Sequence, residues 1–381
     1  MPNAFVLAGG GSRGAYHIGA WQALSELEYK FDIVTGTSVG SLNGALVALG
    51  DLELAKSMWL SIGNRDVMDI PQKVLSPETL QFVRDVARQG GISLAPLEDM
   101  VTRFVDEEQV RGSGVKYGLV TVNLTTREPM ELTLEEIPQG KLVDYMMASS
   151  GCVPFLRPKI IDGQKFIDGG YYDNLPRSLA ARMGADEIVE VDLESIGFDR
   201  PLGQEYSHVN IIRVCSWHDL GNFLEFDPAR AKRNMDLGYL DTYKAFGRLE
   251  GKAYAFKAGE TDKMYADFGM RLMEKCEEIY SAHPAVKLAA ELYLRTERKN
   301  PKTAGDKFLA VLEGAMEAAA LYEGEVYTAH SLAQQLKNTQ PTPFAHIFGS
   351  EGEENMLAKI LATINAVDVK KLYLSIIKSL I

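Results

Sequence analysis

The sequence predicts an α/β fold, because short apolar runs alternate with helical patterns between residues 4 and 193. Two glycine-rich turns mark this alternation, at residues 9–14 and 36–40. Each follows a predicted strand directly and precedes a predicted helix. Strands that alternate with helices in this way form sheets with at least some parallel pairs. We therefore expect a central sheet that is covered by helices.

The first glycine-rich turn joins a strand at residues 4–8 to a helix at residues 15–28. Successive glycines before a helix let backbone N–H groups converge on an anion. Gly9, Gly11 and Gly14 also satisfy the Gly-x-Gly-x-x-Gly pattern of dinucleotide-binding folds, with Asp32 in the next predicted strand. In those folds the acidic residue ends the second strand, whereas Asp32 begins it here. An oxyanion hole therefore fits this turn better than a cofactor site.

The second glycine-rich turn has the pattern Gly-x-Ser-x-Gly and lies between a β-branched apolar run and a helix. This is the setting of a nucleophile elbow, in which Ser38 stands on a strained turn. A β-carbon at Gly36 or Gly40 would collide with its neighbours there. The helix that follows adds the positive end of its dipole beside the hydroxyl. A glycine-rich turn with an incidental serine is the alternative interpretation of this motif alone.

The remainder of the first 250 residues continues the alternation. A helical insertion is predicted within residues 51–115, with helices at 54–60, 77–88 and 96–105. Asp162-Gly163 between two apolar runs predicts a two-residue hairpin, whose second strand ends at Asp168. The other predicted elements are strands at 117–124, 130–134 and 187–193, a helix at 141–148 and a helix opened by residues 174–176.

Together, three motifs resemble those of the patatin-like phospholipases: residues 9–14, 36–40 and 168–170, in this order and spacing. The resemblance covers roughly residues 4–250, with supporting stretches at 148–155, 173–176 and 233–239. It implies a three-layer α/β/α fold with a largely parallel central sheet. It also implies a lipid acyl hydrolase, a serine esterase of the phospholipase A type that forms an acyl-enzyme.

The resemblance assigns roles to single residues. Ser38 is the expected nucleophile and Asp168 its base, because a carboxylate can activate a hydroxyl without an imidazole between them. The implied oxyanion donors are backbone N–H groups of Gly10, Gly11 and one of Ser12 and Arg13. No cofactor and no metal are expected. A catalytically inactive scaffold with the same fold, and a dinucleotide-binding enzyme, are the alternative interpretations.

Histidines are not expected to complete a triad. In the chain order Ser, Asp, His, such a residue would follow Asp168, and no later histidine lies in a recognisable loop signature; these residues are His208, His218, His283, His330 and His346. His17, in the first helix, is expected to pack or to form a hydrogen bond. Two roles are open for the Arg13 side chain, steadying the glycine-rich turn and contact with a substrate phosphate, and we favour the first.

The composition limits the partners. The 381 residues carry a net charge of −12, which excludes the general phosphate binding on which nucleic-acid recognition depends. Three widely spaced cysteines indicate a reducing cytosol. No apolar run is long enough to span a membrane, and the N-terminus has no basic signal region. We expect a cytoplasmic protein that meets its lipid or acyl-ester substrate at a membrane or micelle surface transiently.

We predict two domains, an acyl hydrolase domain at residues 1–250 and a helical domain at 251–381. Cover for the acyl site and assembly into a homo-oligomer are two uses considered for the second domain. Residues 368–381 carry an apolar stripe at helical spacing, which we expect to pack on the protein rather than on a membrane. The predicted helices of this domain are 262–282, 285–298, 304–321, 331–338 and 356–381.

Overall fold

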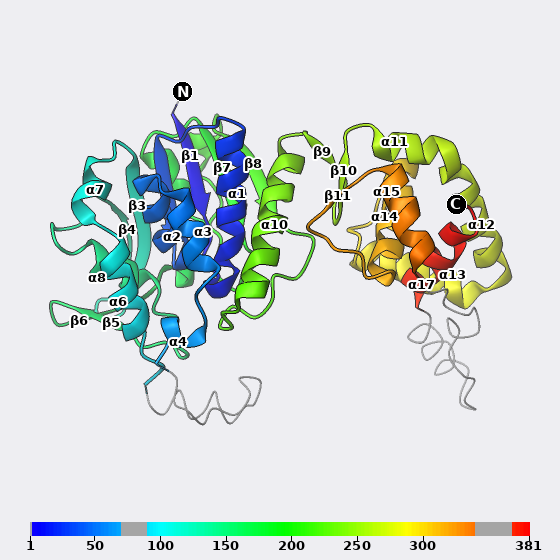
Figure 1. Cartoon of the computed structure of the whole chain (residues 1–381). Coiled ribbons are helices and arrows are strands. Elements are labelled where there is room, and N and C mark those ends of the chain that lie inside the picture. Colours follow the sequence, from blue (N-terminus) through cyan, green and yellow to red (C-terminus); the bar gives the residue numbers. More distant parts are fainter. Residues whose placement is uncertain (1, 70–89, 340–367) are drawn as a thin grey trace. The chain divides into compact units, whose positions relative to one another are not determined.

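The computed structural model describes residues 2–69, 90–339 and 368–381 (Figure 1). The chain divides into two compact units, Met1–Phe246 and Gly247–Ile381. The helix predicted at residues 77–88, and the first part of the helix predicted at 356–381, lie outside the described residues.

A mixed sheet forms the centre of the first unit. Its strands are β1 (Asn3–Leu7), β2 (Ile33–Thr37), β3 (Lys116–Asn123), β4 (Glu128–Thr133), β5 (Lys159–Ile161), β6 (Gln164–Asp168), β7 (Glu187–Asp192) and β8 (Asn210–Cys215). The order is β5-β6-β3-β2-β1-β7-β8, with β4 also paired to β3. In this order, the neighbouring pairs β3-β2, β2-β1, β1-β7 and β7-β8 are parallel. The strands β4, β5 and β6 pair with their neighbours in antiparallel fashion. The prediction missed β8, which is half-exposed and lies at the edge of the sheet.

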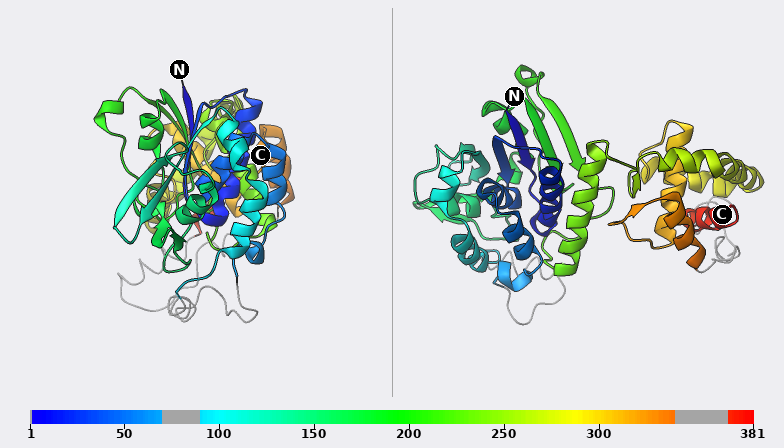
Figure 2. Two further views of the ribbon diagram at one scale, coloured as in Figure 1. Left: turned by 90° about the vertical axis from the view of Figure 1, so that its left-hand side faces the viewer. Right: turned by 45° about the horizontal axis from the view of Figure 1, so that its top comes forward.

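Helices cover both faces of this sheet (Figures 1 and 2). One face carries α1 (Ala15–Glu26), α2 (Val39–Leu49) and α10 (Pro228–Ala245), and the other carries α9 (Arg177–Arg182). Successive residues of β2 point to opposite faces. Val34 thus lies against Gly44 of α2, whereas the Thr35 hydroxyl donates to the Pro176 carbonyl just before α9. The three-layer α/β/α fold is confirmed.

Helices also fill the connection between α2 and β3, as predicted for the described part of residues 51–115. They are α3 (Leu52–Trp59), α4 (Asn64–Val67), α6 (Ala95–Phe104) and α7 (Glu107–Gly112). After β4, α8 (Leu142–Ser149) packs against β3 and α2 with buried methionines, Met146 and Met147. Apolar side chains therefore enclose the part of α2 that follows the glycine-rich turn at residues 36–40.

The β5–β6 hairpin confirms the turn that the sequence predicted. Asp162 and Gly163 both have positive φ, 49° and 80°, as a type I′ turn requires. Lys159 pairs with Phe166 on the returning strand, and Thr121 of β3 pairs with Asp168 at its end. The hairpin thereby carries Asp168 to the edge of the parallel part of the sheet.

The second unit is mainly helical. Its helices are α11 (Glu260–Met264), α12 (Met270–Ala282), α13 (Pro284–Thr296), α14 (Ala304–Ala318), α15 (Ala329–Asn338) and α17 (Val369–Lys378), with a short π-helix at Tyr265–Gly269 between the first two. The sequence did not predict its small sheet, which consists of β9 (Leu249–Glu250), β10 (Ala255–Lys257) and β11 (Val326–Tyr327). Strands of two or three residues are too short to show a period.

The C-terminal helix α17 packs within its own unit. Leu372, Tyr373 and Ile377 are fully buried, and the helix contacts α12, α13 and α14. Lys370 and Lys371, off the apolar stripe, form ion pairs with Glu317 and Asp368 respectively. The expectation that this stripe packs on the protein is confirmed.

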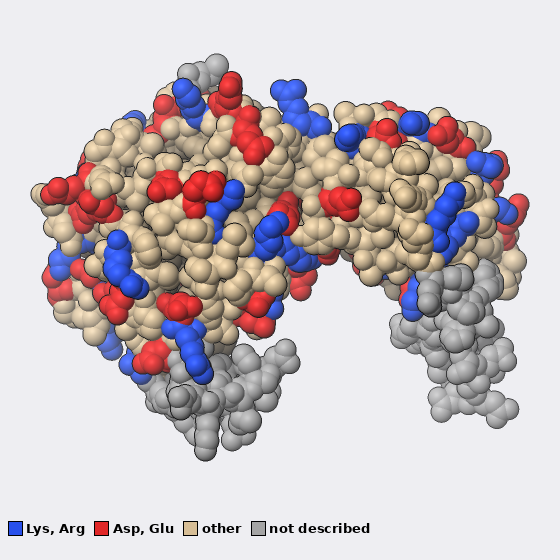
Figure 3. Space-filling model, viewed as in Figure 1, with Lys and Arg blue, Asp and Glu red and all other residues tan. Residues whose placement is uncertain are grey.

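On the face shown in Figure 3, acidic and basic side chains are interspersed over the described part of each unit. Among the described residues, no helix combines the length and the apolar character that a membrane span needs.

This packing predicts that Leu372→Ala destabilises the second unit by about 2–5 kcal/mol, because the buried side chain leaves a cavity. Lys371→Ala, on the exposed side of the same helix, is the matched control and should stay within about 0.5 kcal/mol. Denaturant unfolding measures both. Equal midpoints for the two variants would contradict the packing.

Candidate active site

Ser38 occupies the turn between β2 and α2 in a backbone conformation that side chains rarely adopt, with φ 54° and ψ −126°. A β-carbon at Gly36 would lie 2.2 Å from the Gly40 carbonyl oxygen, and one at Gly40 would lie 2.1 Å from the Leu7 carbonyl oxygen. Both glycines are therefore required by close backbone approach. The turn has the geometry of a nucleophile elbow.

Two hydrogen bonds through the Ser149 side chain of α8 hold the turn at Ser38 in place. The Ser38 N–H donates to the Ser149 hydroxyl oxygen at 2.8 Å, and the Ser149 hydroxyl donates to the Val120 carbonyl at 2.6 Å. Ser149 is fully buried. The sequence analysis gave this residue no role, although it lies in a stretch that supported the family resemblance.

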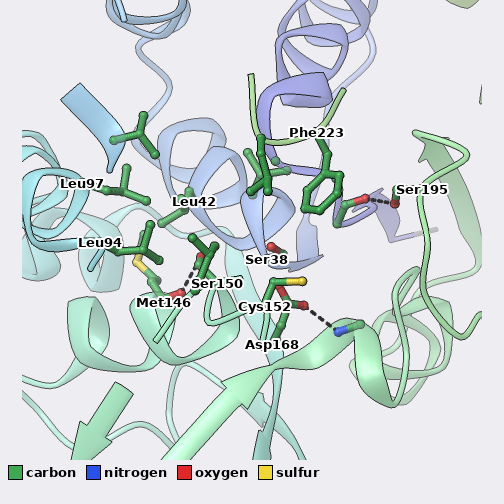
Figure 4. Close-up of a pocket in the computed structure, with 18 of the residues that line it drawn as sticks. Ser38, Leu42, Leu94, Leu97, Met146, Ser150, Cys152, Asp168, Ser195 and Phe223 are labelled. Carbon is green, nitrogen blue, oxygen red and sulfur yellow. Dashed lines mark hydrogen bonds between the residues drawn. The ribbon is translucent and has the colours of Figure 1, made fainter. Parts of the chain in front are cut away.

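Asp168 lies at the end of β6, where it is almost fully buried. Its carboxylate accepts a hydrogen bond from the Gly170 N–H at 2.8 Å, and the Ser38 side chain lies beside it (Figure 4). Burial raises the pKa of Asp168 from 3.8 to about 6, and the neighbouring Gly170 N–H and Ser38 hydroxyl oppose this rise. The structure thus brings together the two residues that the sequence singled out, 130 positions apart in the chain (168 − 38) (Figure 4).

The first glycine-rich turn lies beside this pair, and its backbone N–H groups differ in whether they have an acceptor. The Ser12 N–H donates to the Phe223 carbonyl at 2.8 Å, and the Arg13 N–H donates to the Gly10 carbonyl at 3.2 Å. These two N–H groups are therefore occupied. In the described part of the chain, the N–H groups of Gly10 and Gly11 have no acceptor, and both residues line the same cavity as Ser38.

The Arg13 side chain fastens this turn to its surroundings, as expected. Its guanidinium donates to the carbonyls of Gly221 at 2.8 Å, Glu194 at 3.0 Å and Leu193 at 3.3 Å. Three carbonyls from two loops accept from its Nε and Nη1 atoms, which the planar guanidinium holds in a fixed arrangement. Arg13 thus holds the loop after β7 and the loop after β8 against the glycine-rich turn.

Two further residues at this turn were missed. The Ser195 hydroxyl donates to the Gly9 carbonyl and accepts from the Asn174 amide at 3.1 Å. The Gly9 N–H in turn donates to the Asn174 carbonyl at 3.1 Å. Ser195 is in an irregular loop without a motif, so only the fold could reveal its place. Asn174 stood within the stretch that predicts the start of α9.

A cavity of about 580 Å³ opens above Ser38 and Asp168. Leu42, Leu94, Leu97 and Met146 lie on one side of Ser38, and Phe223 and Ser195 lie on the other (Figure 4). The apolar side is supplied by α2, α6 and α8. A long hydrocarbon group would leave water there while its polar end stays near the hydroxyl.

Comparison with known proteins agrees with this geometry. The patatin-like phospholipase family model matches residues 5–181, which include both glycine-rich turns and Asp168. Residues 5–181 form a patatin-like phospholipase domain.

Relatives share this domain over a small part of their own length. The patatin-like phospholipase domain-containing protein 6 of Homo sapiens is 33% identical over 205 residues, 50% of this chain and 13% of the relative. Lysophospholipase NTE1 of Mycosarcoma maydis is 31% identical over 214 residues, 53% of this chain and 10% of the relative. The crystal structure of VipD from Legionella pneumophila is 14% identical, with a TM-score of 0.40 over 98% of this chain and 90% of that chain.

Histidines contribute no side chain to the cavity of the patatin-like domain, as far as the described residues go. His17 is buried in α1 with its Nδ1 3.3 Å from the Asn43 amide, and burial lowers the pKa of His17 to about 3. It therefore packs as a neutral ring. Asp32 precedes β2 and accepts from the Asn3 N–H, at the opposite end of that strand from Ser38. His346 lies outside the described residues.

The raised pKa of Asp168 predicts that Asp168→Asn stabilises the fold at pH 8. The folded protein loses stability as the pH rises from about 4 to about 6, because the folded state holds the proton of Asp168 more tightly than the unfolded state does. Above pH 6, the ionised and buried Asp168 lowers the free energy of unfolding by about 3 kcal/mol. The amide carries no charge, and its oxygen can still accept from the Gly170 N–H.

Thermal unfolding at several pH values measures this effect, and the difference should vanish near pH 3. Asp162→Asn at the exposed hairpin turn is the matched control and should change little. A variant Asp168→Asn that is less stable than the unmodified protein at every pH would contradict the desolvation.

Proposed function

We propose that the patatin-like domain hydrolyses carboxylic esters of lipids, with Ser38 as nucleophile and Asp168 as general base. The observation that supports this most directly is that these two side chains lie together at an apolar cavity, where the Ser38 hydroxyl favours the ionised form of the Asp168 carboxyl group. An ionised carboxylate next to a hydroxyl can remove its proton as the oxygen attacks. The apolar side of the cavity suits an acyl chain.

The reaction follows in two halves. Ser38 Oγ attacks the ester carbonyl carbon while Asp168 takes the hydroxyl proton, and a tetrahedral intermediate forms. Its collapse breaks the bond to the alcohol, which leaves with the proton from Asp168. Asp168 then removes a proton from water, which attacks the acyl-enzyme. The second collapse releases the carboxylic acid and returns the proton to Ser38.

The oxyanion donors in this proposal are the N–H groups of Gly10 and Gly11. A trans peptide is planar, so the C=O of one residue and the N–H of the next point in opposite directions. Ser195 holds the Gly9 carbonyl, and this fixes the direction of the Gly10 N–H. The Arg13 N–H holds the Gly10 carbonyl, and this fixes the direction of the Gly11 N–H in the same way. Ser195 is thus a positioning residue in this scheme.

The Ser-Asp pair predicts loss of turnover in both Ser38→Ala and Asp168→Ala, with the fold retained. Because the base must be ionised, log(kcat/KM) should rise by about one per pH unit below about 6 and level off above it. Hydrolysis of a soluble short-chain ester measures this.

Ser150→Ala is the matched control, because its hydroxyl lines the same cavity but donates to the Met146 carbonyl. It should retain activity within about tenfold. Full turnover by either of the first two variants would refute the dyad, and a catalytically inactive scaffold would show none even in the unmodified chain.

The peptide geometry predicts that Ser195→Ala lowers kcat by about 10- to 100-fold with little change in KM, because oxyanion contacts mature in the transition state. Affinity for a trifluoromethyl ketone inhibitor should fall in parallel. Ser195→Thr retains the hydroxyl and should restore part of the rate. A rise in KM at constant kcat would instead assign Ser195 to ground-state binding.

A further inference from the structure

The loop after β7 carries apolar side chains into solvent. Ile196 is 97% exposed and Phe198 is 68% exposed, and Tyr171 from the loop after β6 is 43% exposed. All three stand at the cavity that contains Ser38. We call Tyr171, Ile196 and Phe198 the apolar rim. Single exposed apolar residues are common, but a group at the mouth of one cavity is unusual enough to indicate contact with a partner.

The rim is held in place by backbone hydrogen bonds to the loop that follows Asp168. The Phe198 N–H donates to the Gly170 carbonyl at 3.0 Å, and the Asn174 N–H donates to the Phe198 carbonyl at 2.7 Å. The Arg200 N–H donates to the Asp173 carboxylate at 3.2 Å. The backbone of the rim is therefore held in place, and the side chains of Ile196 and Phe198 take no part in these bonds. The Tyr171 hydroxyl donates to the Val153 carbonyl.

We infer that the apolar rim is the surface by which this protein docks on a lipid aggregate. The inference rests on the proposed lipid substrate, because a lipid that leaves an aggregate for the cavity has to pass this mouth. Apolar side chains that enter the aggregate would shorten the path of the acyl chain through water. The docked face and the entry to the catalytic pair are then the same.

The size of the rim favours a lipid surface over a protein. A stable protein interface buries at least about 1,000 Å² in total, which three side chains cannot supply. A few apolar side chains do suffice for weak and reversible insertion into a bilayer, as a single acyl anchor does.

Charge selects the kind of lipid surface. Glu194, Asp199 and Arg200 flank the rim in the same loop, all exposed, so acidic side chains outnumber basic ones there, and the whole chain carries −12. An anionic surface would repel these carboxylates. The rim therefore fits a zwitterionic or neutral aggregate.

The test compares vesicle binding by two variants of the full chain. Both are made with Ser38→Ala, so that lipid hydrolysis does not change the vesicles. The first carries Ile196→Asp and Phe198→Asp, and the second carries Ile160→Asp. Ile160 is the matched control, since it is 62% exposed on β5 and does not line the cavity. Co-sedimentation with phosphatidylcholine vesicles gives the partition coefficient.

The rim variant should bind at least about tenfold more weakly, because each apolar side chain that leaves water contributes roughly this factor. The Ile160→Asp control should bind like its Ser38→Ala parent. Phosphatidylglycerol added to the vesicles should not strengthen binding. Equal binding by the two variants, or no binding by the parent, would overturn the inference. A lipid-free dimer that only the rim variant loses would assign the rim to a second copy instead.

This readout does not depend on activity. If the Ser38→Ala protein still hydrolyses esters, the proposed function fails while the binding result stands. If hydrolysis depends on Ser38 but the rim variant binds vesicles normally, only the docking inference fails. With Ser38 restored, the ratio of vesicle to soluble-ester hydrolysis should fall in the rim variant and stay constant in the Ile160→Asp protein.

Discussion

The site depends on how closely three backbone turns approach one another. Gly40 lies against the Leu7 carbonyl, and a β-carbon on Gly9 would lie 3.1 Å from the β-carbon of Ser38. Side chains at these glycines would separate β1 from the elbow. Because β1 and β2 are parallel neighbours, their carboxyl ends meet at one edge of the sheet, and the turns after them are adjacent. The hairpin strand β6 adds Asp168 at the same edge.

The groups that the proposed chemistry requires lower the stability of the fold. The elbow holds Ser38 at a positive φ, and Asp168 is buried where desolvation raises its pKa. Strain and a desolvated carboxylate both reduce stability, and both concentrate at functional sites. The surrounding hydrogen bonds, from Ser149, Gly170 and Ser195, fix the groups that would otherwise relax. A buried and reactive pair thus requires a well-ordered frame.

The sequence predicted the parts of the site that depend on local backbone rules. The sequence reveals the turns at Gly36 and Gly40 around Ser38 and at Asp162-Gly163 before Asp168, because few other residues tolerate those backbone conformations. The side chain of Ser195 gave no such signal, since its partner Gly9 is distant in sequence and its loop has no period. Only the structure shows that the Ser12 and Arg13 N–H groups are bonded to carbonyls, which leaves those of Gly10 and Gly11 as the proposed oxyanion donors. The short strands of the second unit were missed because pairing, rather than pattern, defines them.

In the proposed mechanism, Asp168 activates Ser38 as a nucleophile. Mass spectrometry after treatment with a fluorophosphonate tests this most directly, because the reagent bonds covalently to an activated serine oxygen. We expect one adduct on the peptide that contains Ser38, formed quickly above pH 6 and far more slowly in the Asp168→Asn protein. An adduct on another residue, or labelling of Ser38 at an unchanged rate without the carboxylate, would contradict it.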